Sequence, residues 1–126
     1  MARVLVIDDE VDMRRLLAAG LGSDGHTVYE AADGVEGTAL LGLHPVDVVI
    51  TDILMPNKEG IETIIELRKT RPGLKIVAMS GGGIMSGADA LRVARSLGAH
   101  ATLRKPFRIA DLRRVVAACL EDGRAP

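Results

Sequence analysis

Five residues spread over most of the chain have side chains that could do chemistry together: Asp8, Asp9, Asp52, Ser80 and Lys105. Carboxylates are hard oxygen ligands, and a small group of them suits Mg²⁺, which keeps positions open for a phosphate. The lysine adds a compact positive charge that pairs with anions, and the serine adds a hydroxyl donor. Brought together, these groups form a site for a doubly charged phosphoryl group held between a metal, an ammonium and a hydroxyl.

The five residues follow or close short aliphatic runs. Asp8 and Asp9 come directly after one run, Asp52 after a second, and Ser80 closes a third, while Lys105 comes just after a fourth. Runs this short and apolar, with helical stretches between them, are typical of buried strands in a parallel sheet. Because parallel strands all end at the same edge, the five side chains are predicted to converge there.

The clustering of three carboxylates has an energetic consequence. Two like charges about 5 Å apart repel by roughly 3 kcal/mol at an effective dielectric constant near 20. Three such groups would destabilise the fold unless a cation is normally present. Asp8 and Asp9 alone could simply begin a helix, where acids favour the dipole. Asp52, at the end of a separate strand, favours the functional interpretation.

The apolar periodicity predicts five strands alternating with five helices. The strands are expected at 4–7, 27–31, 46–53, 75–79 and 101–103. The helices are expected from Val11 to about Leu21, at 35–43, from Ile61 to the Arg71-Pro72-Gly73 sequence, at 87–97 and at 109–121. Strict alternation with short connections predicts an α/β fold, a single doubly wound sandwich covering residues 1–126 with helices on both faces. Periodicity does not fix the strand order.

Composition excludes several classes of protein. Apolar residues make up 48% of the 126 residues, which is typical of a globular domain. A net charge of −1 and only 2% aromatic residues argue against direct nucleic-acid binding. No segment approaches the roughly 20 apolar residues of a membrane span. The lone Cys119 can form no internal disulfide, so a cytoplasmic protein is expected.

Five short motifs together resemble the receiver domain of a bacterial two-component response regulator, as in CheY-like proteins. They stand in the order and approximate spacing of that family, and the resemblance covers residues 3–121. The motifs are Val6-Ile7-Asp8-Asp9-Glu10, Ala32-Asp33-Gly34, Thr51-Asp52-Ile53-Leu54-Met55-Pro56, Met79-Ser80-Gly81 and Lys105-Pro106-Phe107. The resemblance implies a flavodoxin-like (βα)5 fold with a five-stranded parallel sheet in the order 2-1-3-4-5.

The resemblance also implies a phosphoryl site with Mg²⁺ as its cofactor. Asp52 would be the phospho-acceptor, with a histidine kinase or a histidine phosphotransfer protein as the donor. Asp9 and Asp52 would bind Mg²⁺ directly and Asp8 through water, and the backbone carbonyl of Leu54 would give the remaining protein ligand.

The same resemblance implies how the site responds to phosphorylation. Lys105 would bind the phosphoryl oxygens, and Ser80 would move toward them once Asp52 is modified. The Lys105–Pro106 peptide bond is expected to be cis.

Two features depart from the family pattern. Thr102 stands three positions before the lysine, where the family usually has an aromatic ring, so the usual rotation of that ring cannot operate. Ser80 and Lys105 are 25 positions apart, a few more than in a typical receiver. The extra length is assigned to the glycine-rich segment 81–87, which we expect to become ordered on activation.

Output is expected to be a contact with a downstream protein. No output domain is expected, because little follows residue 121, and the face made by 87–97, 101–103 and 109–121 is the docking surface that the family implies. An Mg²⁺-dependent aspartyl phosphohydrolase is an alternative, but it normally needs a second acid where Leu54 stands. A flavodoxin-like cofactor binder is opposed by the acidic strand ends.

Other sequence features are not expected to be functional. Gly20, Gly22 and Gly25 match a dinucleotide-binding fingerprint but end a helix instead of opening one. His26 and the two other histidines lack metal-ligand spacing and are expected in loops.

Overall fold

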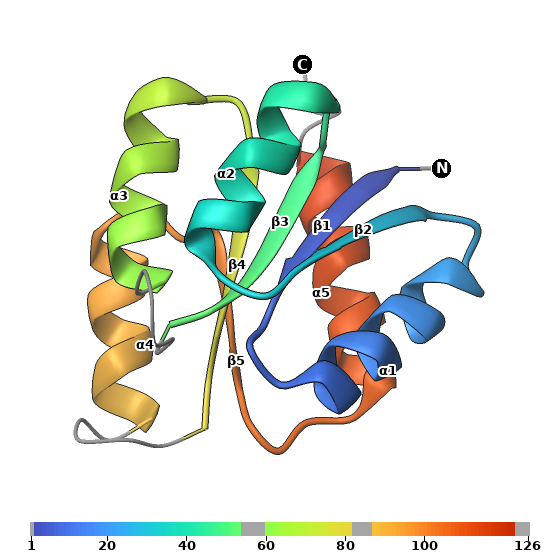
Figure 1. Ribbon diagram of the computed structural model, residues 1–126. Helices are drawn as coiled ribbons and strands as arrows, with labels where there is room; N and C mark the ends of the chain where they lie inside the picture. The colour runs from blue at the N-terminus through green and yellow to red at the C-terminus, as the bar shows by residue number, and fades with distance from the viewer. Residues whose placement is uncertain (1, 54–59, 82–86, 123–126) are drawn as a thin grey trace.

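The computed structural model describes residues 2–53, 60–81 and 87–122, which form a five-stranded parallel sheet flanked by helices (Figure 1). The strand order is β2-β1-β3-β4-β5, as the family resemblance implied. The elements are β1 (Arg3–Ile7), α1 (Val11–Gly22), β2 (Thr27–Ala31), α2 (Gly34–Leu43), β3 (Val48–Asp52), α3 (Gly60–Thr70), β4 (Lys75–Ser80), α4 (Gly87–Ser96), β5 (Ala101–Arg104) and α5 (Ile109–Asp122). The predicted α/β sandwich is therefore confirmed.

The third strand is shorter than predicted at both ends. It was expected at 46–53, but its first ladder pair joins Val48 to Val4 of β1, and its last residue is Asp52. Val46 packs against the core without joining the ladder. Apolarity therefore extended the predicted strand beyond the residues paired in the ladder, although the Ile53 N–H still donates to the Met79 carbonyl at 2.9 Å.

Two apolar layers cover the two faces of the sheet. Helices α1 and α5 pack on one face, and α2, α3 and α4 pack on the other (Figure 1). Successive residues of β1 point to opposite layers, with Val4 and Val6 in one and Leu5 and Ile7 in the other. Because both faces are covered, the central strands contain uninterrupted apolar runs, 48–50 in β3 and 76–79 in β4.

The turns follow the chemistry of their residues. Asp33 caps α2, its carboxylate accepting a hydrogen bond from the Glu36 backbone N–H at 2.8 Å. Gly98 follows α4 with φ +122°, a conformation that side chains disfavour, so glycine suits the end of this helix. In the described part of the chain, none of the helices has the length and apolarity needed to cross a bilayer.

The histidines lie in loops, as predicted. His44 stacks on Tyr29 with ring centroids 4.4 Å apart, and the Nδ1 atoms of His26 and His100 accept backbone hydrogen bonds. Cys119 is buried in the layer beneath α5. The contacts of the three histidines and of Cys119 therefore stabilise the fold.

Candidate functional site

The five candidate residues meet at the carboxyl edge of the sheet. Asp8 directly follows β1, Asp52 and Ser80 are the last residues of β3 and β4, and Lys105 directly follows β5. Three of them touch. The Lys105 Nζ atom lies 2.9 Å from Asp52 Oδ2 and 3.1 Å from Asp8 Oδ2. Residues separated by 53 and 97 positions in sequence are thus joined by one ammonium group.

Neighbouring carboxylates stabilise the charged form of Lys105. Burial by itself would lower the pKa of Lys105, because an ammonium loses hydration in the interior. The hydrogen bond and charge of Asp52, followed by those of Asp8, outweigh that effect and raise the pKa of Lys105 above its ordinary value. The lysine is therefore a fixed positive charge at physiological pH.

Three carboxylates surround a space suited to a divalent cation. Ligand oxygens of Asp8, Asp9 and Asp52 all lie within 4.8 Å of one another. Asp8 is fully buried and Asp52 is 8% exposed, whereas Asp9 is exposed. With Lys105, the group has a net charge of −2, and its donors are the hard oxygens that Mg²⁺ prefers. The residues present therefore fit an Mg²⁺ ion.

The first two aspartates are held differently. Asp8 Oδ1 accepts a hydrogen bond from the Glu10 N–H at 2.9 Å, and its backbone carbonyl accepts one from the Arg14 guanidinium at 2.9 Å. Asp9 makes no hydrogen bond or ion pair with any residue that the structure describes. One carboxylate is therefore fixed by the protein, while the other has its oxygens available for a ligand.

Ser80 carries an unused hydroxyl. Its residue is 1% exposed, and its Oγ has no hydrogen-bond partner in the described structure. Its backbone carbonyl accepts a hydrogen bond from the Lys105 N–H at 2.8 Å. A buried hydroxyl without a partner costs free energy, so Ser80 would gain from an incoming oxygen acceptor.

Two glycines shape the site: Gly60, which sequence reasoning missed, and Gly81, whose close contact with Lys105 was not predicted. A Cβ on Gly60, the first residue of α3, would overlap the Asp52 carbonyl and come within 2.6 Å of Ile53 Cα. A Cβ on Gly81 would lie 2.9 Å from Lys105 Cβ. The signal available in sequence was only a glycine next to a motif, which does not reveal how closely the backbones approach.

Glu10 was also missed as part of the site. Its Oε1 lies 3.9 Å from Lys105 Nζ, and its side chain is 68% exposed. Glu10 adds a weak, solvent-screened contact at the rim of the site.

Some predicted features fall elsewhere. Leu54 lies outside the described residues, as do residues 82–86 of the glycine-rich segment 81–87. The Lys105–Pro106 peptide bond is cis, as expected. Thr102 is half-buried in β5, where it pairs with Ala78 of β4.

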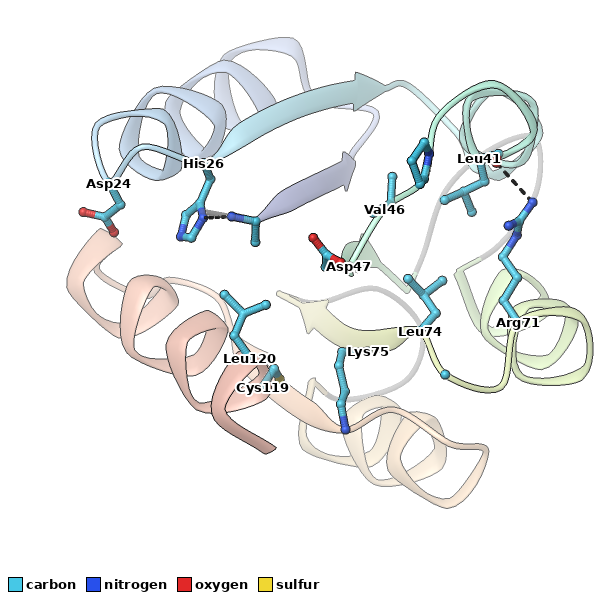
Figure 2. Close-up of a pocket in the computed structure, with 13 residues that line it drawn as sticks. Asp24, His26, Leu41, Val46, Asp47, Arg71, Leu74, Lys75, Cys119 and Leu120 are labelled. Carbon is cyan, nitrogen blue, oxygen red and sulfur yellow. Dashed lines mark hydrogen bonds between the residues drawn. The ribbon is translucent and has the colours of Figure 1, made fainter. Parts of the chain in front are cut away.

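A groove lies at the opposite edge of the sheet. It encloses about 760 Å³ and is lined by the residues leading into the strands and by the end of α5 (Figure 2). His26 Nδ1 accepts a hydrogen bond from the Ala2 N–H at 3.1 Å. The Arg71 guanidinium donates to the Leu41 carbonyl at 3.1 Å. The hydrogen bonds of these groove residues therefore stabilise the fold, although the groove is large.

Comparison with known proteins places the chain in a family. The model of the response regulator receiver domain matches residues 4–117. The chain is 40% identical over 126 residues to sensor kinase CckA of Brucella abortus (strain 2308), covering 95% of this chain and 13% of that protein. It is 39% identical over 111 residues to transcriptional regulatory protein PdtaR of Mycobacterium tuberculosis (strain ATCC 25618 / H37Rv), covering 87% of this chain and 52% of that protein. The chain thus spans only part of these relatives.

Solved structures share the fold over nearly their whole length. The receiver domain of NtrX from Brucella abortus has a TM-score of 0.87 and 32% identity, with 94% of this chain and 98% of that chain covered. A CheY-like receiver domain protein from Methanospirillum hungatei JF-1 has a TM-score of 0.89 and 26% identity, with 98% and 96% covered. The fold is therefore the flavodoxin-like fold of the CheY class. The chain belongs to the response regulator receiver domain family, which acts in two-component signalling.

Proposed function

We propose that Asp52 is the phospho-acceptor of this receiver domain and that Mg²⁺ is its cofactor. The observation that carries the proposal is the position of Lys105, whose ammonium bridges Asp52 and Asp8 beside a cluster of three carboxylates. A histidine kinase or a histidine phosphotransfer protein would supply the phosphoryl group. Asp8, Asp9 and Asp52 would hold the metal, with the Leu54 carbonyl as a further ligand.

The chemistry needs one bond to form and one to break. A carboxylate oxygen of Asp52 attacks the phosphorus of a phosphohistidine, and an oxygen–phosphorus bond forms as the phosphorus–nitrogen bond breaks. The other imidazole nitrogen of the phosphohistidine carries a proton, so the electron pair of the broken bond stays on the ring and neutral histidine leaves. When bound, Mg²⁺ supplies positive charge that offsets the charge on the transferring group.

Two side chains of the chain would stabilise the product. Lys105 would keep its ammonium close to the phosphoryl oxygens, since its pKa is raised above the ordinary value. Ser80 would donate its unused hydroxyl to one of those oxygens. The acyl phosphate thereby changes charge and hydrogen bonding at the ends of β3, β4 and β5, which biases the domain toward a second conformation.

Output would be a contact with a downstream protein through α4, β5 and α5. These elements form the edge of the sandwich next to Lys105. No direct contact with nucleic acid is expected.

Intact-mass spectrometry tests the acceptor directly. The protein is incubated with acetyl phosphate and Mg²⁺, and we expect one added phosphoryl group that is absent in chelator and absent from Asp52→Asn. Asp47→Asn is a matched control, because this exposed aspartate lies at the opposite edge of the sheet. Undiminished labelling of Asp52→Asn would place the acceptor elsewhere and overturn the proposal.

A further inference from the structure

The charges of the chain are segregated along its length. Residues 1–66 contain 13 acidic and 4 basic side chains, a net charge of −9. Residues 67–126 contain 4 acidic and 12 basic side chains, a net charge of +8. The overall charge of −1 therefore conceals an uneven distribution of charge, because the strands of the first part, β2, β1 and β3, lie together in the sheet and those of the second part, β4 and β5, lie beyond them (Figure 1).

Part of the basic half of the chain forms one edge of the fold. β5 is the last strand of the sheet, with α4 on one of its faces and α5 on the other (Figure 1). Five arginines on this edge, which we call the arginine face, are exposed. They are Arg92 and Arg95 on α4, Arg104 on β5, Arg108 before α5, and Arg114 on α5.

Several of these charges are free to act on a partner. Arg92 and Arg114 are paired only with the aspartate three positions earlier on the same helix, and their side chains remain 78% and 75% exposed. Such exposed pairs contribute little. The side chains of Arg95, Arg104 and Arg108 make no hydrogen bond or ion pair with a residue in the described ranges.

We propose that the arginine face docks an acidic segment of a partner protein. The proposal deepens the proposed function and rests on it, since it names the chemistry of the downstream target at the expected output face. Charge complementarity carries the argument, because exposed guanidinium groups pair with carboxylates through two parallel hydrogen bonds. Carboxylates of a partner would gain the donors of Arg95, Arg104 and Arg108, which have no acceptor among the residues that the structure describes.

The composition of the face favours a protein over a nucleic acid. Asp89 and Asp111 lie among the arginines and would repel a continuous line of phosphates. Phe107 is the only aromatic residue in this half of the chain, so there is no set of rings on which bases could stack. An acidic polypeptide can place its carboxylates between the aspartates.

The arginine face is connected to the phosphoryl site through consecutive residues. Arg104 pairs with Ser80 in the sheet, and the next residue is Lys105, whose N–H donates to the Ser80 carbonyl at 2.8 Å. A shift of Ser80 or Lys105 would therefore move Arg104. Thr102 offers no ring to bury or expose, so movement of charged groups replaces ring rotation as the change that a partner detects.

The test is an NMR titration of the full chain with a synthetic glutamate-rich peptide. A glutamine-rich peptide of the same length is the uncharged comparison. We expect amide shifts concentrated at Arg95, Arg104 and Arg108 with the glutamate-rich peptide only. The triple variant Arg95→Gln, Arg104→Gln and Arg108→Gln should bind it about tenfold more weakly, as expected for the loss of three exposed charge pairs.

A second triple variant distinguishes the effect of where the charges lie from the effect of the protein's net charge on peptide binding. Arg3→Gln, Arg15→Gln and Lys69→Gln remove the same charge from exposed positions outside the face, and affinity should fall less than twofold. An equal loss in both variants would overturn the proposal, because attraction would then depend on net charge alone. Tighter binding of a DNA duplex, lost in the first variant, would also overturn it in favour of nucleic acid. Dimers that the first variant dissociates would assign the face to a second copy of the chain and overturn the proposal.

Labelling of Asp52 distinguishes this inference from the proposed function. The first triple variant should accept a phosphoryl group from acetyl phosphate as fully as the parent. If the parent is labelled but the peptide does not bind, the docking inference fails alone. If the peptide binds the arginine face but no labelling of Asp52 occurs, the proposed function fails, and the inference that an acidic segment docks there stands without its link to phosphorylation.

Discussion

The two edges of the sheet differ in whether their polar groups have hydrogen-bond partners within the protein. At the amino-terminal edge, a groove of about 760 Å³ is lined by polar groups with partners, such as Asp47, whose Oδ2 accepts the Arg3 N–H at 2.9 Å (Figure 2). At the carboxyl edge, buried carboxylates crowd one lysine, and the Ser80 hydroxyl has no partner in the described structure. The difference teaches that polar groups without protein partners, more than the size of a groove, distinguish the edge that we propose to be functional.

The largest contrast is expected from removing one lysine at each edge. In chelator, Lys105→Met should destabilise the protein by about 2–3 kcal/mol, because it leaves Asp8 and Asp52 without their cation. Lys75→Met, in the groove, should change the free energy of unfolding by less than about 0.5 kcal/mol. Urea denaturation measures both. Equal effects of the two variants would remove the distinction between the edges.

Replacing a glycine with alanine at each edge should also have different effects on stability. Gly60→Ala should destabilise by about 1–3 kcal/mol, because its Cβ would overlap the backbone at Asp52. Gly73→Ala, in the groove, meets no atom within 4 Å and should be neutral to slightly stabilising. Thermal melting of the two variants is the measurement. A neutral Gly60→Ala would mean that α3 shifts easily away from the acceptor strand.

Replacing an aspartate with alanine should stabilise the protein at the carboxyl edge and destabilise it at the amino-terminal edge. Asp9→Ala should stabilise the metal-free protein by about 1 kcal/mol, since it relieves carboxylate repulsion in a partly solvated cluster. Asp47→Ala should destabilise by about 0.5–1 kcal/mol, since the Arg3 N–H loses its acceptor. Melting in chelator checks both signs. If Asp9→Ala melted below the parent, clustered repulsion would be refuted.

The pH dependence of stability should also differ between ion pairs. The raised pKa of Lys105 means that its contribution is fully present below the ordinary lysine value of 10.5 and is lost as pH rises through the higher folded-state value. The hydrogen bond from Arg113 lowers the pKa of Asp24 below its ordinary 3.8. The contribution of Asp24 is therefore present above 3.8 and is lost as pH falls through the lower folded-state value. Comparing the parent with Lys105→Met and Asp24→Asn by denaturation across pH separates the two. A Lys105 contribution that is lost between neutral pH and the ordinary lysine value of 10.5 would contradict this assignment.

The sequence was sufficient to predict the convergence of the site but not its fine geometry. Asp8, Asp52 and Lys105 were predictable because each lies at the end of a strand or directly after one, and all parallel strands end at one edge. The close approach of Gly60 to Asp52 depends on the angle at which α3 meets β3, which no local pattern encodes. The distance from Glu10 to Lys105 depends on side-chain conformation in the same way.

The strand ends show a similar limit. Val46 and Ile53 bounded the third predicted strand because both are apolar, and the structure shows that Ile53 is buried and Val46 packs against the core. Only the register with β1 and β4 determines that the strand covers Val48–Asp52. Apolar pattern therefore predicts burial reliably, whereas hydrogen-bond pairing depends on partners that are distant in sequence.

One measurement tests most directly whether the carboxyl edge is the cation site. Mn²⁺, a paramagnetic substitute for Mg²⁺ with the same preference for oxygen ligands, is titrated into the ¹⁵N-labelled protein and amide signals are followed by NMR. We predict selective broadening at Asp9, Ser80 and Lys105, with His26 and Lys75 in the groove unaffected. Broadening centred on the groove, or none at the carboxyl edge at millimolar metal, would contradict the proposed site.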